Sequence, residues 1–153
     1  MSEQSLLTPE VRAAVGRASE PVTVTVTLRM VRRAMETYGL EPRDFAPGEP
    51  VPGYVTVALE SEARSVPMPE VMPRSLLISN ELAFERPLRL GEDLTLQNRI
   101  ADISERLGGR FGYSIYVRSE TEFRDSTGAV VARTGQTMMQ YDTTAGDAEE
   151  DEE

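Results

Sequence analysis

The side chains that could carry out chemistry in this 153-residue chain are carboxylates and arginines, because the sequence contains neither His nor Cys. Imidazole is the commonest general base and metal ligand in proteins, and thiolates act as nucleophiles and as zinc ligands. Their absence excludes Ser–His and Cys–His nucleophile pairs, disulfide bonds and thiolate metal sites. We therefore predict no metal site and no cofactor.

The distribution of charge narrows the range of partners. The net charge is −10, and six of the 26 acidic residues occupy positions 147–153. The remainder is only mildly acidic, which argues against a nucleic-acid-binding surface. No apolar stretch approaches the length of a membrane span, and the N-terminus lacks the basic segment and apolar core of a secretory signal. We expect a cytoplasmic protein that binds neither nucleic acid nor membrane.

Two helical segments are predicted from the spacing of apolar residues. Residues 22–27 first alternate as a β-branched strand, and a 3.6-residue pattern then runs over 30–38 and stops at Gly39. After a Pro-rich stretch, a second helical pattern runs from 54 to about 65. Its first turns are apolar and its later turns are charged, so this helix should begin in the core and emerge into solvent.

The rest of the chain predicts long antiparallel strands. Apolar residues alternate with polar ones over residues 76–84, 94–100, 111–123 and 130–141. Long strands in a small sheet curl, and the helix from residue 54 is the only segment apolar enough to fill the concave side. The predicted class is α+β, with a long antiparallel sheet wrapped around a central helix over residues 21–142. A flexible arm, 1–20, would precede it, and a disordered acidic tail, 143–153, would follow.

Three stretches resemble the hot-dog fold of MaoC-like dehydratases, above all the N-terminal, fatty-acid-synthase-like half-domains of that group. Residues 52–56 (PGYVT) resemble the Gly-x-x-Thr start of the central helix. Residues 84–94 (FERPLRLGEDL) resemble a strand–turn–strand motif, and residues 120–132 (ETEFRDSTGAVVA) resemble the closing hairpin. The resemblance implies the hot-dog fold and an acyl thioester as substrate, carried by CoA or by acyl carrier protein.

One expected pair of residues is missing. Catalytic members of the family hold an Asp and a His in the loop before the central helix, where the two side chains clamp the water that is added to or removed from an enoyl thioester. The corresponding stretch here, 40–48, contains Asp44 and no His. We interpret Asp44 as a surface or helix-flanking carboxylate and predict no catalytic residue. The resemblance therefore implies a partner, a MaoC-like hot-dog subunit with the Asp/His motif, whose sheet joins this one edge to edge.

The leading hypothesis is a non-catalytic subunit of a heteromeric MaoC-like enoyl-CoA or enoyl-ACP hydratase, or 3-hydroxyacyl-thioester dehydratase, that shapes the acyl-binding tunnel of its partner. Two alternatives stay open. The first is a hot-dog acyl-CoA thioesterase that uses a lone carboxylate, for which Glu60 and Glu62 are the candidates. The second is a non-enzymatic module that binds an acyl thioester.

Five residues are candidates for substrate binding: Gly53, Tyr54, Val57, Arg106 and Arg110. Gly53 would let the start of the helix approach a backbone or a ligand closely, although turn geometry alone would also explain it. Tyr54 and Val57 would line an acyl channel or else belong to the core. Arg106 and Arg110 flank a Gly–Gly break and suit the phosphates of the carrier, unless they belong to a solvated loop.

Overall fold

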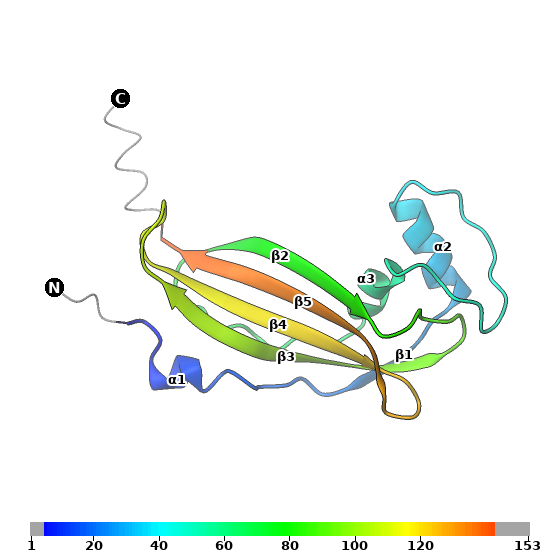
Figure 1. Cartoon of the computed structure of the whole chain (residues 1–153), viewed down its shortest axis with the longest axis horizontal. Helices are drawn as coiled ribbons and strands as arrows, with labels where there is room; N and C mark the ends of the chain where they lie inside the picture. The colour runs from blue at the N-terminus through cyan, green and yellow to red at the C-terminus, as the bar shows by residue number, and fades with distance from the viewer. Residues whose placement is uncertain (1–4, 143–153) are drawn as a thin grey trace.

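A computed structural model of the chain describes residues 5–142 and contains one five-stranded antiparallel sheet with strand order β1-β3-β4-β5-β2. The elements are α1 (Pro9–Arg12), β1 (Val22–Thr25), α2 (Leu28–Thr37), α3 (Val55–Glu60), β2 (Arg74–Phe84), β3 (Asp93–Arg106), β4 (Ser114–Arg124) and β5 (Val130–Tyr141). Figure 1 shows long, curved strands with α2 and α3 at one end of the sheet and the β3–β4 connection at the other. The predicted α+β class is confirmed.

The first predicted helix forms as the sequence indicates. The side chain of Thr27 caps α2 by accepting a hydrogen bond from the backbone N–H of Met30, at 3.2 Å. The apolar face of α2 buries Val31, Ala34 and Met35. This face packs in the core cluster at the α3 end of the sheet, so α2 covers that end.

The prediction of the second helix is wrong at the C-terminal end, because α3 stops at Glu60 rather than near residue 65. Val55 and Leu59 are fully buried, as the apolar first turns predict. Further along, the backbone N–H of Val66 donates to the side-chain oxygen of Asn98 on β3, at 2.9 Å. This bond holds the connection against the sheet, and sequence periodicity carries no sign of such a tertiary contact.

The third long strand begins at Ser114 rather than at Phe111. Gly108 and Gly112 have φ angles of +99° and +68°, and the N–H of Gly108 donates to the carbonyl oxygen of Gly112. Side chains other than glycine rarely adopt these angles, so the segment forms a tight loop instead of extended backbone. Phe111 packs against the ring of Tyr141, with centroids 4.6 Å apart.

The core is divided into two clusters along the concave face of the sheet. The cluster under α2 and α3 includes Leu94 and Phe123, both fully buried. The cluster at the other end includes Ile115, together with Leu7 and Ala14 from the N-terminal segment. The flexibility of arm 1–20 and its boundary stay predictions, and the predicted tail lies outside the described residues. The strip of sheet between the clusters carries polar side chains.

Strand β2 forms one edge of the sheet and is exposed along almost its whole length. It pairs with β5, and its other edge has no partner within the described part of the chain. Its large apolar side chains are between 41% and 49% exposed: Leu76, Leu77, Ile78, Leu82 and Phe84. An open strand edge with this much apolar surface is a site at which another chain can pair.

The turn between β2 and β3 contains a partly buried ion pair. Arg86 donates from both terminal nitrogens to Glu92, at 2.7 and 3.0 Å, and the N–H of Arg89 also donates to Glu92, at 2.6 Å. Burial alone would raise the pKa of Glu92, but the hydrogen bonds from Arg86 and Arg89 outweigh it and hold the pKa below its usual value. Charged Glu92 therefore stabilises the fold.

Because the pKa of Glu92 is lowered by folding, its contribution is present above the ordinary pKa of Glu and is lost as the pH falls through the lowered value. We expect Glu92→Gln to reduce the free energy of unfolding by about 1 kcal/mol at neutral pH and by less in acid. Urea denaturation at neutral and at acidic pH measures the loss in the free energy of unfolding. The control is Glu70→Gln, at an exposed position. Equal destabilisation at both pH values would contradict it.

Candidate functional site

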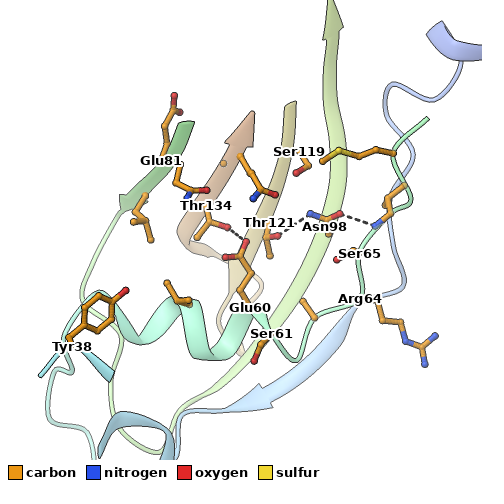
Figure 2. A pocket seen from close by; sticks show the side chains of 18 residues that line it. Tyr38, Glu60, Ser61, Arg64, Ser65, Glu81, Asn98, Ser119, Thr121 and Thr134 are labelled. Carbon is orange, nitrogen blue, oxygen red and sulfur yellow. Dashed lines mark hydrogen bonds between the residues drawn. The ribbon is translucent and has the colours of Figure 1, made fainter. Parts of the chain in front are cut away.

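A cavity of about 530 Å³ lies on the concave face of the sheet, between α3, the connection that follows α3, and strands β2 to β5 (Figure 2). This volume falls within the range of small-molecule sites. The cavity occupies the polar strip between the two apolar clusters, so the sheet supplies its floor and α3 supplies one wall.

The floor of the cavity is polar. Ser119 and Thr121 on β4 and Thr134 on β5 point to the same face of the sheet, and their exposed fractions are 8%, 2% and 6%. Asn98 on β3 also lines the cavity. Its side-chain nitrogen donates to the hydroxyl of Thr121, at 3.1 Å, while its oxygen accepts from the N–H of Val66. Asn98 therefore ties the wall to the floor.

Glu60, the last residue of α3, places a carboxylate in this cavity. The hydroxyl of Thr134 donates to Oε1 of Glu60, and Figure 2 shows the two groups facing each other. The second carboxylate oxygen, Oε2, has no hydrogen-bond partner among residues 5–142. A carboxylate at this position can accept a hydrogen bond from a ligand or a proton from water.

The predicted residues on the central helix lie at or near the cavity. Val57 lines it, although its side chain is 52% exposed. The ring of Tyr54 packs on that of Tyr38, which also lines the cavity, with centroids 4.8 Å apart. A Cβ atom at Gly53 would lie 3.0 Å from the ring of Phe84, so the close neighbour of this glycine belongs to the chain itself.

The structure does not bring the predicted arginines to the cavity. Arg106 ends β3 and Arg110 follows it, at the end of the sheet opposite α2 and α3 (Figure 1). The guanidinium of Arg110 lies 5.8 Å from the ring of Phe111. Their contact with phosphate stays a prediction. Asp44 also lies outside the cavity, where its exposed carboxylate pairs with Arg32 at 2.5 Å.

Sequence reasoning missed Ser119, Thr121 and Thr134 as site residues. Along β4 the inward-facing positions are Ile115, Val117, Ser119, Thr121 and Phe123, and all of them are buried. Two hydroxyl side chains that interrupt an otherwise apolar face are the signal, because buried polar groups need partners. Glu60 was named only as a carboxylate for the thioesterase alternative.

Within residues 5–142, no group of three or more His, Cys, Asp or Glu side chains could hold a metal ion. In the same range, no helix has the length and hydropathy needed to cross a membrane.

Comparisons with known proteins agree on the fold. The model of the family described as the FAS1-like dehydratase domain region matches residues 13–134. No curated protein sequence matches the chain. Among solved structures, the ChsH1–ChsH2 complex from Mycobacterium tuberculosis is similar with a TM-score of 0.64 at 15% identity, over 86% of this chain and 87% of that chain.

Two more of the solved structures with TM-scores above 0.5 are named as dehydratases. The HadBC complex of M. tuberculosis, a (3R)-hydroxyacyl-ACP dehydratase, is similar with a TM-score of 0.57 at 14% identity, over 82% of this chain and 96% of that chain. The MaoC-like dehydratase of Rhodospirillum rubrum gives a TM-score of 0.54 at 14% identity, over 84% and 92% of the two chains. These likenesses confirm the predicted hot-dog fold.

Proposed function

The chain belongs to the family of FAS1-like dehydratase domain regions, and from this premise we propose that it is the non-catalytic subunit of a heteromeric enoyl-thioester hydratase or 3-hydroxyacyl-thioester dehydratase. In this role the chain shapes the acyl site for a MaoC-like partner that carries the Asp/His pair. The substrate is an acyl-CoA or an acyl-ACP thioester. A cytoplasmic location and a role in fatty acid metabolism belong to the same proposal.

The observation that carries the proposal is the open edge of β2. Its exposed apolar side chains, together with its unpaired backbone groups, suit the edge strand of a second sheet. Two of the similar solved structures, HadBC and ChsH1–ChsH2, are themselves named as complexes. We therefore propose that a second hot-dog subunit, the MaoC-like chain with the Asp/His pair, binds at this edge.

The side chains of the cavity support a division of labour between two subunits. Hydration of an enoyl thioester needs a base for the attacking water and a proton donor for the α-carbon. This chain has no imidazole, and Asp44 is held in an ion pair away from the cavity. The groups that move protons would therefore come from the partner, while this subunit contributes binding surface.

Measurement of enoyl-CoA hydration with and without a partner tests the proposal. We expect no hydration by the purified chain and clear turnover by its co-expressed complex with a His-containing MaoC-like chain. Replacing that partner's His by Ala should lower turnover by roughly 100-fold or more, since general acid–base catalysis contributes this much. The partner by itself is the control. Hydration by this chain in isolation would overturn the proposal.

A thioesterase is a second candidate, which one observation favours: Glu60 lies in the cavity with one free carboxylate oxygen, whereas Glu62 is exposed and does not line it. In such a reaction Glu60 takes a proton from water, the water oxygen bonds to the thioester carbonyl carbon, and the C–S bond breaks as the thiol leaves with a proton. Release of free thiol by the chain without a partner would support this candidate. Binding of acyl-CoA without turnover under any of these conditions would support a non-enzymatic module.

A further inference from the structure

We infer that the cavity recognises a hydrogen-bond donor on its acyl-thioester ligand through the carboxylate of Glu60 and the hydroxyl of Ser119. The inference rests on the proposed role in acyl-thioester handling and adds the chemical class of the ligand. The donor is a hydroxyl group on the acyl chain or an amide N–H of the pantetheine arm, and the two sources are separated by experiment below.

The free carboxylate oxygen of Glu60 requires a hydrogen-bond donor from the ligand. An ionised carboxylate is only an acceptor, and Thr134 satisfies one of its two oxygens. The charged residues that line the cavity beside Glu60 are engaged elsewhere, since Arg64 pairs with Glu20 and Glu81 pairs with Arg118. No described side chain therefore competes for Oε2 of Glu60, and a donor from the ligand is its available partner.

The hydroxyl of Ser119 offers the ligand a second hydrogen-bonding position. Ser119 as a residue is only 8% exposed, and its hydroxyl, which remains accessible from the cavity, has no hydrogen-bond partner among residues 5–142. Gln136 lies opposite Ser119 in the β4–β5 register, also lines the cavity, and also has no side-chain partner in that range. A group that enters here meets a hydroxyl and an amide that are ready to bond.

These polar groups act against a plain hydrocarbon chain. Filling the floor with methylene groups would remove water from Glu60 and Ser119 without replacing the lost hydrogen bonds, which is unfavourable. Other lining residues, Val57, Met68 and Leu82, provide apolar contact. The mixed lining fits a ligand that is mostly hydrocarbon but carries a polar group at one position.

The test is calorimetric titration of the full chain with decanoyl-CoA, with decanoyl-CoA derivatives hydroxylated at each chain position in turn, and with CoA alone. If the donor is on the acyl chain, wild type binds one hydroxylated derivative more tightly than decanoyl-CoA, and Glu60→Leu lowers this preference by roughly tenfold or more. If the donor is on pantetheine, Glu60→Leu weakens binding of all the probes equally, CoA included.

Three further variants keep the test interpretable. Glu60→Gln should retain most of the effect, because its amide oxygen still accepts. Ser119→Ala, a small change in a buried position, should weaken binding of the preferred derivative several-fold. Glu62→Leu, on the exposed turn after α3, should bind every probe as wild type does.

Unchanged binding of every probe by both Glu60→Leu and Ser119→Ala would overturn the inference and leave the proposed function standing, because that function is judged by turnover with a partner. Failure of wild type to bind any probe would also overturn the inference. Thermal unfolding of each variant verifies that it is folded.

Discussion

A chain that carries both Leu76→Glu and Ile78→Glu is expected to stay folded and to lose the proposed partner subunit. Each of these side chains on β2 is 47% exposed, so the substitutions remove little packing within the chain. At an interface the same positions would force two charges into an apolar, desolvated strand edge. We expect the dissociation constant of the complex to rise by roughly 100-fold or more, since unpaired buried charges cost several kcal/mol.

Light scattering coupled to size exclusion measures this loss as a shift from two hot-dog units to one. The other edge of the sheet provides a matched control, because Thr23 on β1 is also exposed at a strand edge. Thr23→Glu should leave assembly unchanged. Circular dichroism confirms that each variant is folded. Assembly of the doubly substituted chain at wild-type concentrations would show that β2 is not the interface.

Leu59→Ala is expected to lower the free energy of unfolding by about 2–5 kcal/mol, the usual range for a large-to-small change in a packed core. Leu59 is fully buried in the cluster that joins α2 and α3 to the sheet. A natural domain is stable by only about 5–15 kcal/mol, so this loss is a large fraction of the total. Because Glu60 follows Leu59 directly, loosening α3 should also weaken ligand binding in the cavity.

Val57 is the control for this prediction, since it lies on the same helix but is 52% exposed. Val57→Ala should change the free energy of unfolding by less than about 1 kcal/mol. Urea denaturation of both variants, with the midpoint and slope measured together, decides the matter. Similar losses in the two variants would mean that α3 does not present Leu59 to the core as described.

The long strands and the apolar start of α3 could be predicted because their side chains follow a fixed period. Ile115, Val117 and Phe123 alternate with polar residues, and this alternation alone places them on one face of a strand. The end of α3 at Glu60 was not predicted, because the segment after it is held against the sheet by long-range contacts, such as the hydrogen bond from the N–H of Val66 to Asn98, 32 residues away in the sequence. Periodicity is a local property and contains no such contact.

The candidate site was harder to predict than the fold for the same reason. Glu60 and Thr134 meet only because β5 lies over the end of α3, across 74 residues of sequence. Arg106 and Arg110 have the chemistry that suits phosphate, but the sheet is long enough to hold them at the end away from α3 (Figure 1). The residue types in the sequence identified candidate site residues. Whether those residues lie at the cavity depends on strand length and register, which the sequence pattern does not fix.

The exposed β2 strand also bears on how such a subunit is produced in the cell. Under the proposed assembly, a newly folded copy without its partner would expose the unpaired edge of β2, with its apolar side chains, to the open sheet edges of other chains, including a second copy of itself. Balanced synthesis of the two polypeptides would shorten this vulnerable interval. Surplus copies would be lost to aggregates or to proteases, so the scarcer polypeptide would fix the amount of working enzyme.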